Sequence, residues 1–483
     1  MRKTLLLGFL LLAVEFTFSS VIKQIDEFDG ILTATWLQSW GYNSDTNIII
    51  LYDKVIKEIQ PNSFVEFSNL EYLSIPKSEI KSLVTDTFKG LTNLKILILS
   101  QNKIESIDSD VFSVLTNLEY LDLLGNNLKD IDSDWFKGLN KLNLLDVSSN
   151  SISEIDESSF ADLVNLKFLT VNSNLFDDIS WVKNLRSLVT LSVSGNKIAS
   201  LDGDVFSELK NLQSLDLSKN LISKINVDDF GTLKDLVSLD ISSNKLTEIH
   251  AGTFANLESL ETLNLSYNLL VDIVTDAFKG LKKLDDLNLA NNKIVNVEPN
   301  AFSDSKNLIT LELGSNSIAA IHFGAFKGLT NLRYLDLFVN KIKFIDDFSF
   351  QDLISVETLD LDDNSLITIE PNMFVGLENL KVLYLSENSL VLLHSDVFES
   401  LKNIRQIYLA DNEISFIDKS EFRSLKTLQL VYLKGNKLEY LDQNIIQGLT
   451  NLVLFCISMN MFPTGFTLNL NELNLTQNSL FSC

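Results

Sequence analysis

Cysteine and histidine are scarce in this chain, with two cysteines and three histidines among 483 residues. Two cysteines are too few for a disulfide framework, so an apolar core has to stabilise the fold. After the N-terminal segment, no apolar run reaches the roughly 18 residues that a membrane-spanning helix needs. The sequence therefore predicts neither a disulfide-stapled domain nor a membrane-spanning segment.

Basic residues are also few, because 39 Lys and Arg stand against 64 Asp and Glu, which gives a net charge of −25. A surface of this charge repels phosphate backbones and anionic lipid head groups. Nucleic acid is therefore not an expected partner. A cationic partner, calcium, or simply solubility is compatible with such a charge.

The three histidines, His250, His322 and His394, lie at the same place in three different repeats, with three repeats between neighbours. In a stack of repeats they are separated by about 15 Å or more. They therefore cannot share a metal ion or a proton. No nucleophile with a base is marked elsewhere, so we expect no catalytic residues, no metal site, no cofactor and no enzyme activity.

The first residues are typical of a secretory signal. Arg2 and Lys3 precede the apolar run TLLLGFLLLAV, and Thr17 and Ser19 offer small residues at the positions that a signal peptidase reads. Removing residues 1–19 takes away two basic residues and one acidic residue and changes the net charge from −25 to −26. We expect a secreted, extracellular product; an uncleaved anchor is the alternative.

One unit of 24 residues recurs along most of the chain. Its pattern is L-x-x-L-x-L-x-x-N. Lys54 occupies the asparagine position of the first unit and Ser78 that of the second. The steps from Asn174 to Asn196 and from Asn460 to Asn478 are shorter than the others. The pattern predicts about nineteen turns, with asparagines at Asn102, Asn126, Asn150, Asn174, Asn196, Asn220, Asn244, Asn268, Asn292, Asn316, Asn340, Asn364, Asn388, Asn412, Asn436, Asn460 and Asn478.

Each unit combines two periodicities. Leu121 and Leu123 alternate with Asp122, which predicts a short strand with both leucines on one face. Ile131 and Phe136 follow at a wider spacing that suits an irregular or short helical return. No unit covers its apolar face alone, but stacked units do. We expect an α/β solenoid: a curved horseshoe of about 19 turns, with a parallel β-sheet on the concave face and irregular or short helical turns on the convex face.

Two repeated positions belong to the predicted core. The asparagine amide carries donors and acceptors for backbone groups where the strand turns away. Phenylalanine stands ten residues after the asparagine position, and Ile446 replaces it near the end. We expect these rings to pack as a spine under the convex surface rather than to bind a ligand. They are Phe64, Phe88, Phe112, Phe136, Phe160, Phe206, Phe230, Phe254, Phe278, Phe302, Phe326, Phe350, Phe374, Phe398 and Phe422.

This pattern resembles the extracellular, 24-residue class of leucine-rich repeat proteins, and the resemblance covers roughly residues 47–480. The class includes Toll-type receptor ectodomains, slit, chaoptin-like adhesion proteins and secreted insect leucine-rich immune proteins. The resemblance implies a secreted, non-catalytic scaffold for a protein ligand, in innate immunity or as a receptor-like ectodomain. Cell adhesion, extracellular matrix or guidance is the alternative.

The chain differs from this class at both ends, which are usually closed by cysteine-rich caps. Trp36 and Trp40, four residues apart, can lie as an apolar lid over the first turn. Cys483 resembles the first cysteine of a C-terminal cap whose remainder is missing. We divide the chain into a signal peptide (1–19), an N-terminal cap without cysteines (20–46), leucine-rich repeats (47–462) and a last irregular repeat with an incomplete cap (463–483).

The outward-pointing strand position changes character along the chain. It is mostly acidic or amide up to Asp360 and then becomes Tyr384, Tyr408 and Tyr432. Three tyrosines on successive turns form a rigid amphipathic strip, which is typical of a protein-binding hot spot. Like charges stacked about 4.8 Å apart repel each other, so the acidic edge favours a cationic partner.

We therefore expect a basic partner with an apolar knob between Asp336 and Tyr432; an ordinary solvated face is the alternative. The candidate contact residues are Arg333, Asp336, Glu357, Asp360, Asp362, Asp363, Tyr384, Arg405, Tyr408 and Tyr432.

Carboxylates also recur six residues after the asparagine, as in Asp132 and Asp156. We expect them to cap a turn, with calcium binding as the alternative.

Two N-glycosylation sequons, Asn264 in NLS and Asn474 in NLT, fall in the outward column. A glycan on Asn264 would block the middle of the concave face and direct a partner toward the C-terminal half or a flank. Cys456 and Cys483 lie one turn apart, beyond the roughly 7 Å Cα separation that a disulfide allows in a rigid stack. An unpaired or intermolecular Cys483 is therefore favoured over an internal bridge, and a homodimer or another partner covering the last turn is expected.

Overall fold

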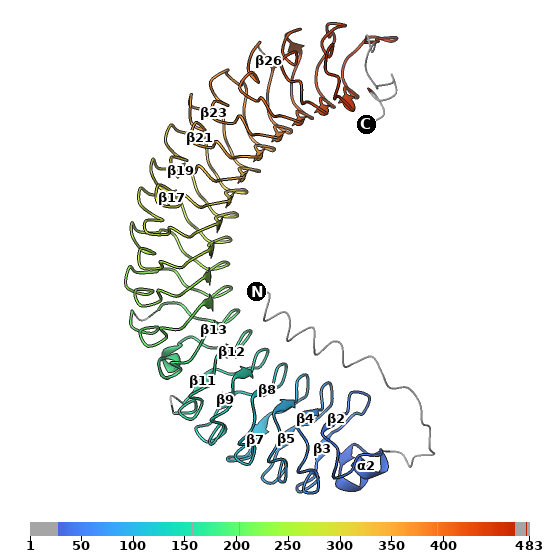
Figure 1. The fold of residues 1–483 in the computed structure, drawn as a ribbon, viewed down its shortest axis with the longest axis vertical. Helices are drawn as coiled ribbons and strands as arrows, with labels where there is room; N and C mark the ends of the chain where they lie inside the picture. The colour runs from blue at the N-terminus through green and yellow to red at the C-terminus, as the bar shows by residue number, and fades with distance from the viewer. Residues whose placement is uncertain (1–27, 157, 202, 394, 469–479, 481–483) are drawn as a thin grey trace.

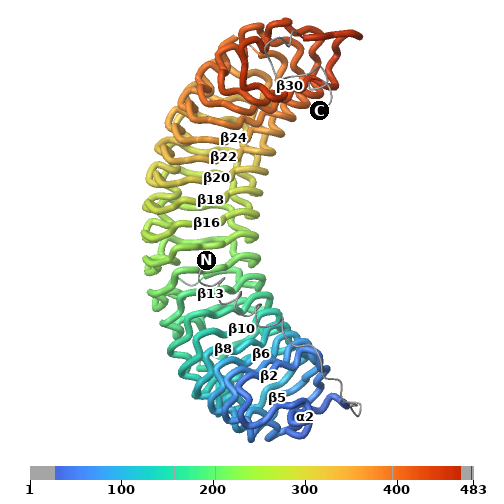
Figure 2. The backbone as a smooth tube through the Cα atoms, turned by 45° about the vertical axis from the view of Figure 1, so that its right-hand side comes forward, coloured from blue at the N-terminus to red at the C-terminus, as the bar shows by residue number. Residues whose placement is uncertain are grey.

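The computed structural model describes residues 28–156, 158–201, 203–393, 395–468 and Leu480. The predicted signal peptide, Asn474 and Cys483 lie outside these residues. Each repeat forms one turn of a continuous coil, and the turns follow one another in an open arc with the strands on its inner side (Figures 1 and 2). Eighteen turns with a strand are described, and the nineteenth predicted turn, around Asn478, lies outside the described part.

The inner sheet is parallel, and each strand pairs with the strand of the next turn. Its strands are β2 (Ile48–Ile50), β4 (Tyr72–Ser74), β6 (Ile96–Ile98), β8 (Tyr120–Asp122), β10 (Leu144–Asp146), β12 (Phe168–Thr170), β13 (Thr190–Ser192), β14 (Ser214–Asp216), β15 (Ser238–Asp240), β16 (Thr262–Asn264), β18 (Asp286–Asn288), β20 (Thr310–Glu312), β22 (Tyr334–Asp336), β24 (Thr358–Asp360), β25 (Val382–Tyr384), β27 (Gln406–Tyr408), β29 (Leu430–Tyr432) and β30 (Leu454–Cys456). The middle residue of each strand is buried, as the alternation predicts.

Shorter strands pair outside this sheet, on the flank that follows the asparagine (Figure 1). The pairs are β1 (Ile31–Leu32) with β3 (Glu58–Ile59), β5 (Ser82–Leu83) with β7 (Ser106–Ile107), β9 (Asp130–Ile131) with β11 (Glu154–Ile155), β17 (Asp272–Ile273) with β19 (Asn296–Val297), β21 (Ala320–Ile321) with β23 (Phe344–Ile345), and β26 (Leu392–Leu393) with β28 (Phe416–Ile417).

The returns contain less helix than the sequence analysis allowed. Among residues 28–156, 158–201, 203–393 and 395–468, only α2 (Ala34–Ser39) and the 3₁₀ helix η1 (Ser180–Asn184) are helical. The other returns are single turns closed by i→i+3 bonds, such as Leu139 N–H to Phe136 O at 3.1 Å. A helix is about 10 Å wide, whereas neighbouring strands lie about 4.8 Å apart. If every return were a helix, the returns would be wider than the spacing of the strands. Narrow turns therefore fit the strand spacing better. None of the described helices is long and apolar enough to cross a bilayer.

The asparagine ladder has the predicted role. Asn220 Nδ2 donates to Val193 O and Leu217 O, both at 3.0 Å, and Asn220 Oδ1 accepts from Ile198 N–H at 3.1 Å. The amide thus joins its own turn to the preceding one in the core. Ser78 does part of this work in the second turn, where its hydroxyl accepts from Ile56 N–H and donates to Lys54 O.

The phenylalanine spine is also confirmed. Phe254, Phe278 and Phe302 stack with centroid distances of 6.4 and 5.4 Å, and all three are buried. The short turn between Asn174 and Asn196 has no phenylalanine at this position. There η1 inserts the buried Trp181, whose ring lies 5.4 Å from that of Phe160. The 24-residue pattern does not predict this substitution, because this turn is two residues shorter than the repeated unit and Trp181 lies seven rather than ten residues after the asparagine.

Aromatic packing closes the N-terminal end without cysteine. Trp36 and Trp40 lie 5.8 Å apart, and each ring centroid is 5.2 Å from that of Phe28. Leu37, on the same helix α2, is fully buried. Thr33 caps this helix, because its hydroxyl accepts from Trp36 N–H at 3.3 Å. The inward residues Ile49 and Leu51 of the first turn are therefore buried, whereas its outward residue Ile48 stays exposed.

Candidate functional site

The structure brings the three predicted tyrosines into one ladder. Tyr384, Tyr408 and Tyr432 end β25, β27 and β29, and their strands pair so that the tyrosines are direct neighbours. The ring centroids are 4.7 Å apart for Tyr384 and Tyr408, which stack, and 6.1 Å apart for Tyr408 and Tyr432. We call these three residues the tyrosine ladder. Fixed strands hold its rings, so a partner would find this surface already ordered.

Polar groups fix the middle of the ladder. The Tyr408 hydroxyl donates to Gln406 Oε1 at 3.1 Å, and Gln406 belongs to the same strand. Burial, followed by the neighbouring tyrosine, raises the pKa of Tyr384 and Tyr408 above the usual value. Both hydroxyls are therefore neutral at physiological pH and can donate hydrogen bonds. Gln406 was not identified from the sequence.

The aspartates of the outward column are less free than the sequence analysis assumed. Asp336 Oδ1 accepts from Phe338 N–H at 2.8 Å, and Asp360 Oδ1 accepts from Asp362 N–H at 3.0 Å. The same bond to the residue two positions later occurs at Asp216. Each carboxylate thus closes the turn after its strand, and Asp336 and Asp360 are half-buried.

This environment weakens the acidity of the column. Burial raises the pKa of Asp336 to about 6 and that of Asp362 to about 7, and it also raises the pKa of Asp360. The Asp336 and Asp362 carboxyls are therefore partly protonated near neutral pH. The negative field near the tyrosine ladder is weaker than the formal charges indicate.

Glu357 is neutralised by the chain itself. Its Oε2 lies 2.6 Å from Lys381 Nζ, and its Oε1 lies 3.7 Å from Arg333 Nη1. The hydrogen bond from Lys381 is the main reason that the pKa of Glu357 lies below its usual value, and Arg405 adds to the effect. Glu357 therefore already has cationic partners within the chain, and its contact with a ligand stays a prediction. Lys381 could have been found from the sequence, because it stands 24 residues after Glu357 and so occupies the same position in the next turn.

Asp362 and Asp363 lie in the turn beyond the strand rather than on its face. Asp363 is exposed and has a left-handed backbone with φ of 52°. Asp362 Oδ1 accepts from Ser386 N–H of the next turn. Both residues border the tyrosine ladder from one side instead of standing in line with it.

The raised aspartate pKa values predict a pH-dependent stability. An unfolded aspartate has a pKa of 3.8, so the folded chain binds more protons than the unfolded chain between about pH 4 and pH 7. Stability is then highest at the acidic end of this window and falls as the pH rises through about 6 and about 7. We expect the melting temperature, followed by circular dichroism, to be a few degrees lower at about pH 8 than at about pH 5.

Asp362→Asn should reduce this difference, because it removes one of the two described carboxyls, Asp362 and Glu421, whose pKa burial raises to about 7. The matched control is Asp363→Asn, which changes an exposed neighbour in the same turn. A wild-type chain that melts at one temperature across this range would contradict the assignment.

The other carboxylate column caps turns, as predicted. Asp156 and Asp418 accept from the N–H groups of Ser158 and Ser420 at 2.8 and 2.9 Å. Among the described residues, no group of three or more His, Cys, Asp or Glu side chains is arranged to hold a metal ion. His322 Nδ1 lies 3.2 Å from Asp346, and His394 lies outside the described residues.

The sequon asparagine Asn264 is half-buried on the inner sheet. Its Nδ2 donates to Asp240 at 3.1 Å, and its Oδ1 accepts from the Ser266 hydroxyl at 2.7 Å. Both polar atoms of the side chain thus have partners on this face. Glycosylation of Asn264 remains a prediction.

Cys456 does not point outward as a free thiol. It is fully buried and disulfide-bonded, and it pairs in register with Tyr432. The other cysteine of the sequence, Cys483, lies outside the described residues. On the strand next to Tyr432, the tyrosine ladder is therefore followed by the buried Cys456 of β30.

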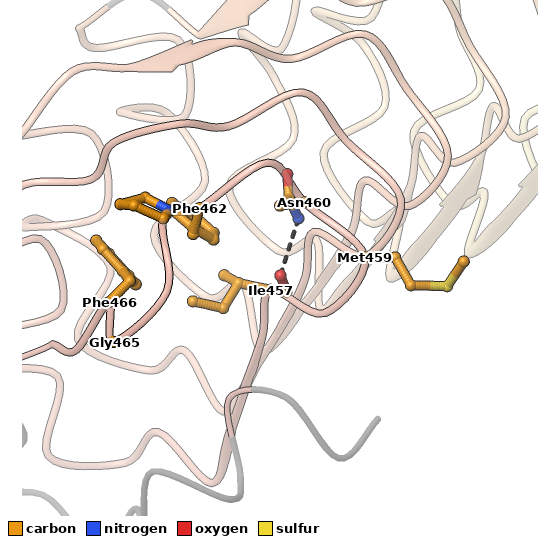
Figure 3. A pocket seen from close by; sticks show the side chains of 7 residues that line it. Ile457, Met459, Asn460, Phe462, Gly465 and Phe466 are labelled. Atoms are coloured by element: carbon orange, nitrogen blue, oxygen red, sulfur yellow. Dashed lines mark hydrogen bonds between the residues drawn. The ribbon is translucent and has the colours of Figure 1, made fainter.

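A pocket of about 260 Å³ lies at the C-terminal end of the coil. Figure 3 shows the rings of Phe462 and Phe466 facing each other beside Ile457, whereas Met459 points away. The two rings stack at 4.2 Å. The amide of Asn460 already donates to Leu433 O and Ile457 O. The pocket thus combines two aromatic rings with polar lining atoms, and the Asn460 amide among these already has partners.

Comparison with known proteins gives a consistent family match. The profile described as "Leucine rich repeat" matches residues 68–128, 116–176, 186–246, 234–294, 283–342, 339–390, 355–414, 378–438 and 403–462. None of the curated proteins searched matches the chain in sequence.

Solved structures share the fold at low identity. A leucine-rich repeat protein of Leptospira interrogans is 23% identical, with a TM-score of 0.60 over 92% of this chain and 96% of its own. Toll from Drosophila, solved with Spatzle, is 20% identical, with a TM-score of 0.67 over 84% of this chain and 60% of its own. The HAESA ectodomain of Arabidopsis, solved with an extended IDA peptide hormone, is 25% identical, with a TM-score of 0.51 over 82% and 72%.

Proposed function

Because this chain belongs to the leucine-rich repeat family, we propose that it is a non-catalytic scaffold that binds a protein ligand on its concave face. The tyrosine ladder is the observation that carries this proposal. It combines ordered aromatic rings with neutral hydroxyl groups, which is the composition of binding hot spots; the Tyr408 hydroxyl already donates to Gln406 and can accept from a ligand. The solved complex of HAESA with a peptide hormone supports a ligand-binding role for such a solenoid.

The proposed ligand presents an apolar knob to the tyrosine ladder and basic groups to Asp336 and Asp360. These carboxylates keep one oxygen on the turn, so the second oxygen is the group that a ligand can use. Glu357 with its two cationic partners forms the rim rather than a docking point. The net charge of −25 also favours a basic ligand over an acidic one.

We further propose that the mature protein is secreted and glycosylated. The N-terminal signal pattern and the sequons support this. The proposed role is recognition in innate immunity or as a receptor-like ectodomain. Cell adhesion, extracellular matrix or guidance is the second candidate.

A phage-displayed library of constrained peptides, selected on the intact chain, tests the site. We expect selected peptides to combine Lys or Arg with an aromatic or aliphatic residue. Tyr408→Ala combined with Asp360→Ala should weaken their binding by roughly 10-fold or more, measured by calorimetry. Asp216→Ala with Asp240→Ala is the matched control, because it removes two aspartates of the same column far from the ladder.

Two results would contradict this site. One is a library that yields only acidic peptides. The other is binding that survives the Tyr408 and Asp360 changes but is lost in the control. The adhesion alternative predicts aggregation of cells that display the chain, which the recognition role does not require.

A further inference from the structure

One flank of the coil changes from polar to apolar in the C-terminal half. The position four residues after the asparagine holds Glu58, Ser82 and Ser106 in the N-terminal turns. In the later turns it holds Phe344, Leu392, Phe416 and Tyr440. The adjacent position contributes Ile367 and Val391. We call these six residues, Phe344, Ile367, Val391, Leu392, Phe416 and Tyr440, the flank stripe.

The side chains of the stripe are exposed, except that of Leu392, which is half-buried. The side chains of Phe344, Phe416 and Tyr440 are 53%, 54% and 67% exposed. Backbone bonds tie the turns together at this flank, because Val391 N–H donates to Ile367 O and Ser415 N–H donates to Val391 O. The stripe therefore belongs to a rigid surface, and it lies outside the inner sheet that carries the tyrosine ladder (Figure 1).

The exposed area fits a protein interface. Three half-exposed aromatic rings with the aliphatic side chains between them present on the order of 500 Å² of apolar surface. A stable interface buries about 800 Å² on each partner, of which roughly 60% is apolar. The stripe alone thus provides nearly the whole apolar part of a standard interface.

The charges around the stripe fit a second copy of this chain. One border, one and three residues after the asparagines, carries Lys341 and Lys343 at the Phe344 end of the stripe. At the Tyr440 end it carries Glu413, Lys437 and Glu439, and there Lys437 and Glu413 pair with each other at 3.1 Å. The other border, six residues after the asparagines, is acidic, with Asp346, Glu370, Asp418 and Asp442. A twofold axis along the stripe places Lys341 and Lys343 of each copy opposite Asp346 of the other.

We propose that two copies of this chain associate through their flank stripes. Elsewhere the excess of carboxylates opposes the approach of a second copy, whereas here apolar contact along the stripe and opposite charges at its Phe344 end favour it. This arrangement leaves both concave faces outside the interface. It does not depend on the function proposed for the tyrosine ladder, and it would present two such ladders on one particle.

Sedimentation equilibrium of the intact chain tests the proposal. We expect a monomer–dimer equilibrium at or below tens of micromolar. Phe344→Glu with Phe416→Glu should raise the dissociation constant at least about 100-fold, because each change buries a charge against an apolar surface. The matched control is Ser82→Glu with Ser106→Glu, which adds the same charges at the same repeat position in the N-terminal half and should leave the dimer intact.

A second variant distinguishes a weakened dimer from a misfolded monomer. Phe416→Ser with Tyr440→Ser shortens two exposed side chains without adding charge, and it should also weaken the dimer while the melting curve of the monomer is unchanged. A wild-type chain that is monomeric at tens of micromolar would overturn the proposal, and so would a dimer that survives both pairs of stripe substitutions. Peptide binding at the tyrosine ladder is measured separately, so either proposal can fail alone.

Discussion

Phe278→Ala is expected to lower the free energy of unfolding by about 3–5 kcal/mol. Phe278 is fully buried, and its ring stacks on Phe254 and Phe302 with interplanar angles of 2° and 4°. Alanine would remove the apolar area of the ring and leave a cavity that two neighbouring turns share. The fixed spacing of the parallel strands prevents the turns from closing that cavity, so little of the loss can be recovered by relaxation.

The damage should stay local, because each turn of a solenoid contacts only its neighbours. Hydrogen exchange measured by mass spectrometry should show faster exchange in the turns around Phe254 to Phe302. Amides of β6 and β8, far along the coil, should keep their protection. Phe338→Ala is the matched control, since Phe338 is 43% exposed on the same array and its truncation should cost less than about 0.5 kcal/mol. Equal melting of wild type and Phe278→Ala would contradict a structural spine.

Asn220→Ala should cost about 1–3 kcal/mol, measured as a lower urea midpoint. The side chain is buried and satisfies Val193 O, Leu217 O and Ile198 N–H in the core. Alanine leaves these backbone groups without a partner where water cannot replace it. The cost comes from desolvated polar groups rather than from lost apolar area.

Two comparisons separate this reason from a general loss of packing. Asn220→Ser should recover part of the stability, because Ser78 occupies the equivalent position and its hydroxyl accepts from the N–H group 22 residues earlier, as the asparagine amides do. Asn211→Ala is the control, since Asn211 makes a single exposed bond to Arg186 O at 3.1 Å and should cost well under 1 kcal/mol. A urea midpoint for Asn220→Ala equal to that of wild type would contradict the ladder.

Asn211 belongs to a second ladder that the sequence analysis missed. Asn93, Asn117 and Asn165 each donate from Nδ2 to a backbone oxygen 25 residues earlier, at 2.7–2.9 Å. The signal was visible in the repeated "TNL" and "KNL" segments. It was missed because these residues lie outside the L-x-x-L-x-L-x-x-N pattern, and exposed asparagines are common in loops for other reasons.

The concave face shows where sequence reasoning stops. The alignment of Tyr384, Tyr408 and Tyr432 on successive turns followed from the 24-residue spacing, and the strand pairing confirms it. The hydrogen bonding of the aspartates in the same column did not follow from the spacing. Whether Asp360 faces water or accepts from Asp362 N–H depends on how the chain turns after the strand, and the repeat pattern leaves that open.

The sequence by itself determined the number and order of the turns, the inward rows of leucine, asparagine and phenylalanine, and the column that becomes the tyrosine ladder. It could do so because one apolar pattern, repeated at a fixed interval, leaves stacking as the way to bury every copy. Only the tertiary structure decided which charges are already satisfied, such as Glu357 by Lys381, and that Cys456 is buried. These outcomes depend on side-chain contacts between neighbouring turns, and distances of a few ångströms decide them rather than the order of residues along the chain.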